Sequence, residues 1–218
     1  MTIKGFIFDL DGVITDSAEY HYQAWKNLAK TIEIEIDREF NEELKGISRM
    51  DSLERILVHG KRSQDFSAEE KTALAAEKNA EYVKLIENVT PKDILPGILT
   101  LLEDLKDQGI KLALASASKN GPMILEKLAL ADYFETIVDP ESLAQGKPDP
   151  EIFLKGASQL GLVPSQCVGV EDAAAGITAI NQAQMFSVGV GDPESMKEAD
   201  YRVNHTGDLN LAKILSLV

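Results

Sequence analysis

The stretch Lys4-Gly5-Phe6-Ile7-Phe8-Asp9-Leu10-Asp11-Gly12, near the start of the chain, decides the fold. Its apolar run is typical of one buried strand, and the polar turn that follows the run ends the strand. Similar apolar runs follow at residues 110–115, 136–138, 167–170 and 186–190. The first three of these also end in polar residues, which are Ser116, Asp139 and the pair Glu171-Asp172. We therefore expect five buried strands.

Helical patterns with clear ends lie between these strands. Residues 98–108 follow Pro96-Gly97 and stop at Gly109, and residues 151–160 follow Asp149-Pro150 and stop at Gly161. Strands that alternate with helices of this length form a parallel sheet with helices on both faces. The predicted fold class is α/β, a doubly wound parallel sheet with a Rossmann-like core.

Residues 15–92 break this alternation. Two capping boxes, Asp16-x-x-Glu19 and Ser67-x-x-Glu70, precede long helical patterns, and shorter patterns cover 37–45 and 48–59. Residues 32–36 alternate apolar with acidic side chains, but no strand signal is convincing. We therefore predict an all-helical cap domain at 15–92, inserted into an α/β core of residues 1–14 and 93–218. The two connections, near Gly12-Val13 and Thr90-Pro91, are expected to act as a hinge.

Composition limits the partners and the location of the protein. The chain has 218 residues, 44% of them hydrophobic, and its 22 Lys and Arg against 36 Asp and Glu give a net charge of −14. Strong acidity argues against binding to nucleic acid or to an anionic membrane. No apolar run approaches the ~18 to 20 residues of a membrane span, and the start resembles no signal peptide. The single cysteine, Cys167, fits a reducing compartment. We expect a soluble cytoplasmic protein, a monomer, that acts on a small molecule.

Polar side chains gather where the predicted strands end. Ligands of doubly wound sheets bind at the carboxyl ends of the strands, near the point where the strand order reverses. Four carboxylates in one crevice raise one another's pKa unless a cation separates them, and oxygen-only ligands favour Mg²⁺ over zinc. The sequence thus predicts a magnesium site that is formed by Asp9, Asp11, Glu171 and Asp172.

A phosphoryl-transfer site is the chemistry that these residues indicate. Ser116 and Lys147 are suitable partners for phosphate oxygens, one aspartate can attack phosphorus, and Asp11 can act as general acid and base. Each motif also has a simpler interpretation. Asp-x-Asp-Gly is a common turn, Glu171-Asp172 can cap a helix, residues 116–121 can start one, and Lys147 can be a solvated loop lysine.

Four motifs of the haloacid dehalogenase-like hydrolase superfamily resemble stretches of this chain. They are Phe8-Asp9-Leu10-Asp11-Gly12-Val13, Ser116, Gly146-Lys147-Pro148-Asp149 and Val170-Glu171-Asp172, and a helical cap after the first motif is also typical. Residues 12–21, 44–49 and 115–120 resemble the β-phosphoglucomutase family more closely. That family of isomerases interconverts β-D-glucose 1-phosphate and β-D-glucose 6-phosphate through β-glucose 1,6-bisphosphate.

The resemblance implies a role for each site residue. Asp9 would carry the phosphoryl group, Asp11 would be the acid and base with its carbonyl on Mg²⁺, and Glu171 and Asp172 would complete the metal site. Ser116 and Lys147 would hold the transferring phosphate, and Arg49 the second one. The implied substrate-binding set is Asp11, His21, Gly46, Ile47, Ser48, Arg49, Lys78, Ser116, Ala117, Ser118, Lys119 and Asn120.

Alternatives remain for two cap residues and for the reaction. Lys78 falls on an apolar helical stripe, where it is either a site residue or a lysine that reaches solvent at the stripe's edge. His21 shares a face with Trp25, where a core histidine is the usual outcome. A magnesium-dependent sugar-phosphate phosphatase uses the same four motifs, and a non-enzymatic receiver-like module also has an acidic pocket with an aspartate and a lysine.

Overall fold

The computed structural model describes residues 2–218 and contains one parallel sheet of six strands in the order β3-β2-β1-β4-β5-β6. The strands are β1 (Gly5–Phe8), β2 (Lys111–Leu114), β3 (Thr136–Ile137), β4 (Cys167–Glu171), β5 (Phe186–Val190) and β6 (Tyr201–Val203). The chain first builds the sheet outward from β1 through β2 and β3, and then crosses to β4 on the other side of β1. This order confirms the predicted doubly wound sheet.

The central strand β1 is buried along its whole length. Phe8, its last residue, pairs with Leu114 of β2 on one side and with Val170 of β4 on the other. The strand order reverses between β1 and β4, so the residues that follow Phe8 and Val170 lie next to each other at the carboxyl edge of the sheet. The register therefore places the acidic turn after β1 beside the acidic end of β4.

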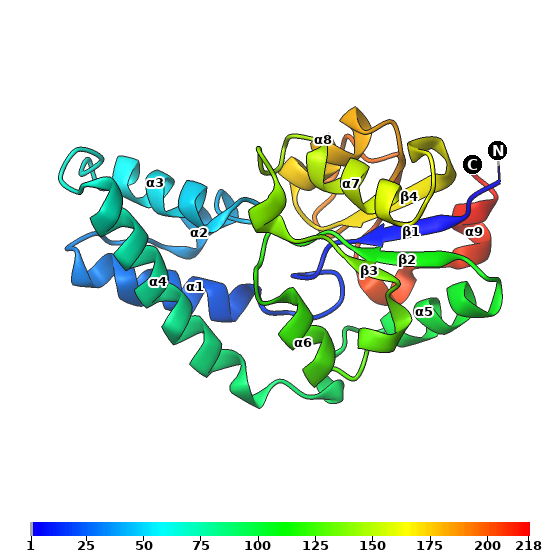
Figure 1. Cartoon of the computed structure of the whole chain (residues 1–218), viewed down its shortest axis with the longest axis horizontal. Coiled ribbons are helices and arrows are strands. Elements are labelled where there is room, and N and C mark those ends of the chain that lie inside the picture. Colours follow the sequence, from blue (N-terminus) through cyan, green and yellow to red (C-terminus); the bar gives the residue numbers. More distant parts are fainter. Residues whose placement is uncertain (1) are drawn as a thin grey trace.

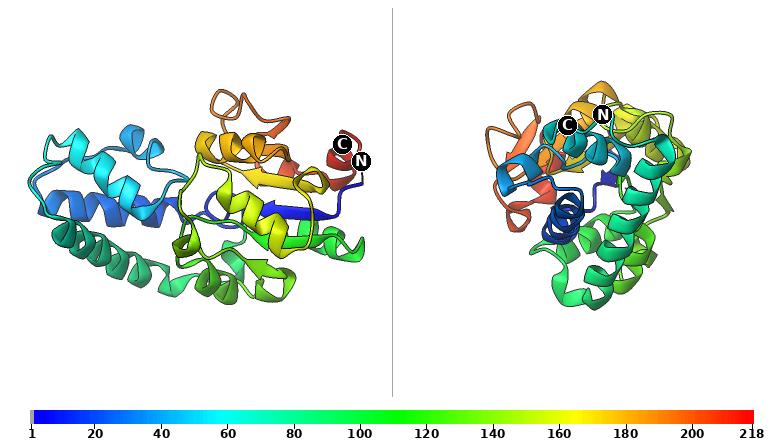
Figure 2. Two further views of the ribbon diagram at one scale, coloured as in Figure 1. Left: turned by 45° about the horizontal axis from the view of Figure 1, so that its top comes forward. Right: turned by 90° about the vertical axis from the view of Figure 1, so that its left-hand side faces the viewer.

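Helices cover both faces of the sheet (Figures 1 and 2). Apolar residues of α5 (Ile98–Asp107), α6 (Gly121–Lys127) and α9 (Leu211–Leu215) share one buried cluster with Phe6 and Phe8. Residues of α7 (Glu151–Gln159) and α8 (Ala174–Gln182) share a second cluster with Ile7, whose side chain points to the opposite face. The alternating side chains of β1 thus contribute to an apolar layer on each face of the sheet.

The far edge of the sheet differs from the sequence prediction, which has five strands. A sixth strand, β6, pairs with β5 through residues Tyr201 to Val203. Three residues give too short a pattern to identify a strand, and Tyr201 and Arg202 are not buried.

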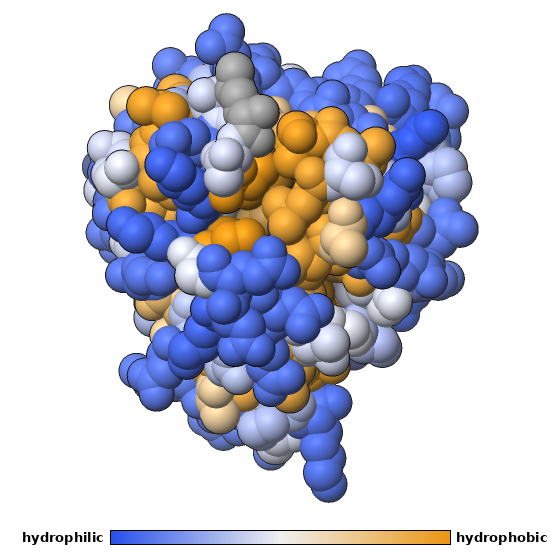
Figure 3. Space-filling view, turned by 90° about the vertical axis from the view of Figure 1, so that its right-hand side faces the viewer, coloured by the Kyte–Doolittle hydropathy of each residue, from blue (hydrophilic) through white to orange (hydrophobic). Residues whose placement is uncertain are grey.

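On the end of the molecule that carries both termini, apolar side chains surround a hollow (Figure 3). No helix within residues 2–218 is long and apolar enough to cross a membrane.

Four α-helices between β1 and α5 lie beyond the carboxyl edge of the sheet (Figure 1). They are α1 (Ala18–Thr31), α2 (Arg38–Glu42), α3 (Arg49–His59) and α4 (Ala68–Leu85), and we call them the helical segment. The segment has its own buried apolar cluster, which includes Trp25, Leu28 and Leu53. No strand occurs between residues 16 and 92, as the sequence predicts. The proposed domain boundaries at 14–15 and 92–93 stay a prediction.

The two capping boxes have different outcomes. Ser67 and Glu70 form the predicted box at α4: the Ser67 hydroxyl accepts from the Glu70 N–H at 3.2 Å, and the Ser67 N–H donates to Glu70 Oε2 at 2.7 Å. The box at Asp16 is wrong, because α1 begins after Ser17 and has no side-chain cap. Glu19 instead accepts two bonds from the Arg38 guanidinium, at 2.7 and 3.1 Å.

The two connecting stretches between the helical segment and the sheet are joined to each other by hydrogen bonds. The Thr15 hydroxyl donates to the Asp93 carbonyl at 2.7 Å, and the Leu95 N–H donates to the Ile14 carbonyl at 3.0 Å. These bonds bring the predicted hinge regions together as a paired connection. The hinge motion itself stays a prediction.

We expect Ser67→Ala to lower the free energy of unfolding by about 1 kcal/mol, because the substitution removes the hydroxyl acceptor of the capping box. Urea unfolding followed by circular dichroism measures the change. Ser165→Ala, at an exposed serine, is the control. An unchanged midpoint for Ser67→Ala would show that the box contributes nothing to stability.

Candidate active site

Three carboxylates meet at the point where the strand order reverses. Asp9 directly follows β1, Glu171 is the last residue of β4, and Asp172 comes next. One oxygen from each of the three lies within 4.8 Å of the others. Asp9 is 4% exposed and Glu171 is fully buried. The parallel register therefore concentrates negative charge in a space with little access to water.

Lys147 lies between two of these acids. Its Nζ donates to Asp9 Oδ1 at 2.6 Å and to Glu171 Oε2 at 2.8 Å, and its side chain is buried. Burial lowers the pKa of Lys147, but Asp9 and Glu171 outweigh burial, and the net pKa is raised. The lysine is therefore a permanent buried cation, and the alternative of a solvated loop lysine is wrong.

The acids fit a hard divalent metal ion. Burial, and then the charge of Asp9, raise the pKa of Glu171 well above its ordinary value and that of Asp172 to about 8. One lysine does not neutralise three carboxylates, so the cluster has room for further positive charge. An all-oxygen donor set suits Mg²⁺ rather than zinc. The side chains of Asp9, Glu171 and Asp172 could hold the ion, whereas the Asp11 carbonyl stays a predicted ligand.

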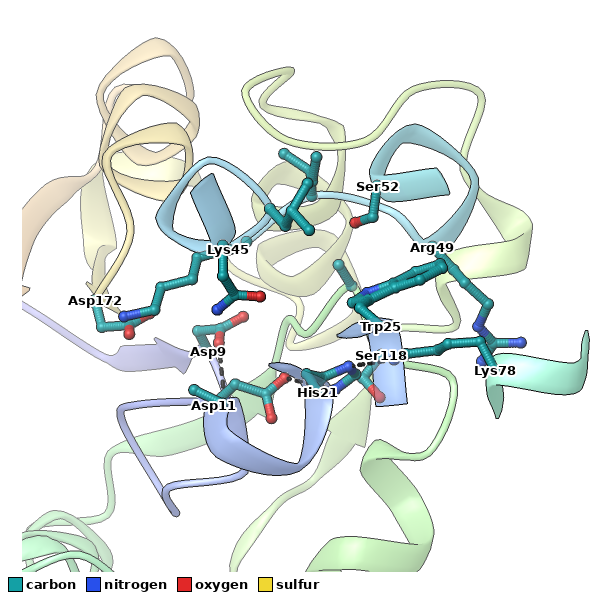
Figure 4. A pocket seen from close by; sticks show the side chains of 16 residues that line it. Asp9, Asp11, His21, Trp25, Lys45, Arg49, Ser52, Lys78, Ser118 and Asp172 are labelled. Carbon is teal, nitrogen blue, oxygen red and sulfur yellow. Dashed lines mark hydrogen bonds and ion pairs between the residues drawn. The ribbon is translucent and has the colours of Figure 1, made fainter. Parts of the chain in front are cut away.

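Asp11 lies at the side of this cluster and faces the pocket (Figure 4). Its N–H donates to Asp9 Oδ2 at 3.0 Å, and its carboxylate accepts from the Ser17 hydroxyl. His21 Nε2 is 3.8 Å from Asp11 Oδ2. Burial and the neighbouring Asp9 raise the pKa of Asp11 to about 8. Asp11 can therefore hold or release a proton near neutral pH, as a general acid and base must.

The turn after Asp11 requires glycine. Gly12 has a φ of +76°, where a side chain is strained. A Cβ at this position would also collide with the carboxylate of Asp172. The Asp-x-Asp-Gly sequence is therefore more than a common turn, because its glycine makes space for the third acid.

The other end of the pocket is basic. Arg49 is the first residue of α3, and Lys78 lies on α4, so both cations come from the helical segment. Figure 4 shows them on the side of the pocket away from Asp172. Lys78 is only 2% exposed, its Nζ is 2.7 Å from His21 Nδ1, and it lies over the Trp25 and Tyr82 rings at 4.7 and 4.8 Å. Lys78 is therefore not a lysine that reaches solvent at the stripe's edge.

Burial controls the charge of this basic end. Burial, and then the charge of Arg49, lower the pKa of Lys78 to about 7. Burial, Lys78 and Arg49 together hold the pKa of His21 well below 6.5, so the imidazole is neutral at neutral pH. His21 lines the pocket and its side chain is 26% exposed, so it is not a buried core histidine. A protonated Lys78 can then donate to the imidazole Nδ1 and keep its other N–H groups for a ligand.

The loop after β2 forms another wall. Ser116 is buried, and its hydroxyl accepts from the Ser118 N–H at 3.1 Å. The exposed Lys119 pairs with Glu141 in an adjoining groove, and Asn120 Nδ2 donates to Asn79 Oδ1 at 2.9 Å. The loop ends at α6, whose first residue is Gly121, so it starts a helix as well as lining the pocket.

Most of the predicted site residues surround one pocket. Those that line it are Asp9, Asp11, His21, Gly46, Ile47, Arg49, Lys78, Ala117, Ser118 and Asp172. Ser116, Lys147 and Glu171 are buried close to it. Ser48 is placed differently, because its hydroxyl accepts from the Asp51 N–H and caps α3.

The sequence analysis missed several lining residues. They are Ala18, Trp25, Asn41, Leu44, Lys45 and Ser52. Lys45 opposes the rise in the pKa of Asp172, which burial and Asp9 cause. Its place directly before Gly46 was the available signal.

The helix-cap interpretation of Glu171-Asp172 is wrong, because the residue before α8 is Ala173 and no side chain caps that helix.

Comparison with known proteins identifies the same family as the motifs of the sequence. The haloacid dehalogenase-like hydrolase family matches residues 3–184. The β-phosphoglucomutase of Bacillus subtilis strain 168 is 53% identical over 209 residues, which cover 96% of this chain and 92% of that protein. Hexitol phosphatase A of Escherichia coli K12 is 34% identical over 202 residues, 88% of this chain and 85% of that protein.

A solved structure of a related protein has the same fold. The crystal structure of β-phosphoglucomutase from Clostridium difficile matches this chain with a TM-score of 0.98 and 52% sequence identity. The match covers 99% of this chain and 97% of that one. It therefore includes the helical segment as well as the sheet.

We expect a pH-dependent stability difference between wild type and Lys78→Met. The pKa of Lys78 is about 7 in the folded state and 10.5 ordinarily, so between these values the unfolded state binds more protons. The wild type should therefore gain stability relative to the variant as the pH rises from about 7 to 10. Urea unfolding at several pH values measures the gain.

Lys84→Met, which removes an exposed lysine of the same helix, is the control. A flat difference for Lys78→Met would contradict the lowered pKa.

Proposed function

The chain belongs to the haloacid dehalogenase-like hydrolases and, within them, to the β-phosphoglucomutase family, and we propose that it interconverts β-D-glucose 1-phosphate and β-D-glucose 6-phosphate. The observation that carries this proposal is the division of the pocket. Carboxylates for the reacting phosphate lie at one end, and Arg49 and Lys78 lie at the other (Figure 4). A sugar with a phosphate at each end fits such a pocket in two directions.

Asp9 is the nucleophile in this proposal. One of its carboxylate oxygens accepts a hydrogen bond from Lys147 and the other accepts one from the Asp11 N–H, so the side chain is held in one orientation. When bound at Asp9, Glu171 and Asp172, Mg²⁺ would neutralise phosphate oxygens during transfer. Ser116 would also bond the transferring phosphate, and Lys147 would lower the negative potential near it.

Asp11 moves the proton. A sugar hydroxyl attacks the phosphorus on Asp9, so a new O–P bond forms while the Asp9 O–P bond breaks, and Asp11 takes the hydroxyl proton. In the return step Asp11 gives the proton back to the leaving sugar oxygen. A pKa of about 8, raised by burial and by Asp9, places both forms of Asp11 within reach at neutral pH.

The basic end supports the exchange of the two phosphates. Arg49 would bind the phosphate that is not reacting, because a planar guanidinium can make two parallel bonds to phosphate oxygens. The bisphosphate formed in the first step, β-glucose 1,6-bisphosphate, would turn round and return its other phosphoryl group to Asp9. Residues 15–92 would act as a cap that excludes water, so the acyl phosphate meets sugar.

Two other functions use parts of this site. A sugar-phosphate phosphatase is the main rival, since Hexitol phosphatase A is 34% identical to the chain. A phosphatase transfers the phosphoryl group to water and needs no binding site for a second phosphate. A receiver-like phospho-acceptor has no use for the basic end or for the helical segment.

The deciding experiment supplies β-D-glucose 1-phosphate, Mg²⁺ and a catalytic amount of β-glucose 1,6-bisphosphate. Glucose 6-phosphate is followed by a coupled dehydrogenase and free phosphate by a colorimetric assay. The proposal expects glucose 6-phosphate in large excess, and its loss in Asp9→Asn. Release of free phosphate as the main product would replace the mutase by the phosphatase.

We expect Arg49→Ala to lower kcat/KM for β-D-glucose 1-phosphate by about 10- to 100-fold, the cost of one charged contact with the second phosphate. Phosphorylation of Asp9 by acetyl phosphate should change much less, because this donor has no second phosphate. Steady-state assays and mass spectrometry of the phosphoenzyme measure the two rates. Arg55→Ala, at an exposed arginine of the same helix, is the control, and equal losses in both assays would refute this role of Arg49.

A further inference from the structure

Asn79 joins Arg49, which would bind the second phosphate, to Asn120, a member of the implied substrate-binding set. Its Oδ1 accepts from Arg49 Nη2 at 2.8 Å and from Asn120 Nδ2 at 2.9 Å. One carboxamide oxygen thus binds a guanidinium and an amide at the same time. Neither the motifs nor the apolar pattern of the sequence singles out Asn79.

The three residues come from separate parts of the fold. Asn79 lies on α4, Arg49 begins α3, and Asn120 precedes α6 on the sheet side of the pocket. The two bonds therefore connect α3 and α4 of the helical segment with the loop after β2. Lys78, the preceding residue of α4, contacts His21 through its Nζ.

The partner of Arg49 is neutral, which matters for a phosphate ligand. No ion pair within residues 2–218 includes Arg49, although its guanidinium is half-buried. An amide oxygen satisfies one N–H group and fixes the direction of the fork, but it leaves the positive charge in place. A carboxylate in the same place would orient the fork equally well and neutralise it.

We propose that Asn79 is a positioning residue that holds Arg49 and Asn120 together as one binding site for the non-reacting phosphate. The inference rests on the proposed function and deepens it, because it assigns the geometry of the second phosphate's site to a residue that does not itself touch the reacting atoms. The bond to Asn120 can form only while the helical segment lies close to the loop after β2, so the site is complete only in that arrangement. Arg49 then meets the phosphate with its direction already set, which reduces the entropy lost on binding.

The test compares Asn79→Asp with Asn79→Ala. Asp has nearly the shape of Asn and keeps the acceptor oxygen, but its charge would pair with Arg49 and compete with phosphate. Binding of glucose 6-phosphate to the Mg²⁺-loaded protein is measured by calorimetry at fixed ionic strength. Phosphorylation of Asp9 by acetyl phosphate is measured on the same samples. Asn88→Asp, the same change at an exposed asparagine, is the matched control.

The expected result is a Kd for glucose 6-phosphate raised by more than about tenfold in Asn79→Asp and by a few-fold in Asn79→Ala. Asp9 phosphorylation and the control should stay near wild type. A purely structural role reverses the order, because the nearly isosteric Asp would then be tolerated better than Ala. An equal Kd in wild type and Asn79→Asp, or equal losses in both assays, would overturn the proposal.

This outcome is independent of the mutase test. A wild type that releases free phosphate would overturn the proposed function, while the order of the two Asn79 variants in binding would still decide the role of Asn79. A mutase whose Asn79→Asp variant binds glucose 6-phosphate normally would overturn only the role of Asn79.

Discussion

Repulsion among buried carboxylates is the constraint on which the rest of the site depends. The register of β1 against β4 brings Asp9 and Glu171 to the same edge of the sheet, and Asp172 joins them. Lys147 bonds two of the three and remains charged because they surround it. The sheet can carry this cluster because its apolar layers on both faces contribute the stability that the uncompensated charge removes.

Charge is distributed between the two parts of the fold in a complementary way. The sheet supplies the acids and one cation that is already committed to them, whereas the helical segment supplies Arg49 and Lys78. In the proposed function a ligand with phosphate at both ends would therefore bridge the two parts, and neither part would bind it fully alone. Burial keeps His21 neutral and weakens the proton affinity of Lys78, so the basic end is less charged than its composition suggests.

How much could be predicted depended on how local each signal was. The strands, and the acids that follow them, were predictable because a buried strand and its polar end lie within about ten residues of sequence. Lys147 was predictable as a site residue, but its bond to Asp9 was not, since Asp9 is far away along the chain. Asn79 could not be found, because which side of α4 meets Asn120 is decided by packing between separate elements. The Asp16 capping box failed because α1 begins one residue later, after Ser17, and β6 is too short for any pattern.

Gly12 shows how a motif letter can be fixed by a distant residue. The Asp172 carboxylate occupies the space that a side chain at position 12 would need. Loss of this glycine therefore needs a smaller side chain at position 172 and also a turn with another backbone path, because the φ of +76° strains any side chain. Across related sequences the two positions should covary, and a chain that has kept Asp9 but changed both of them would mark a lineage in which the metal site has been abandoned.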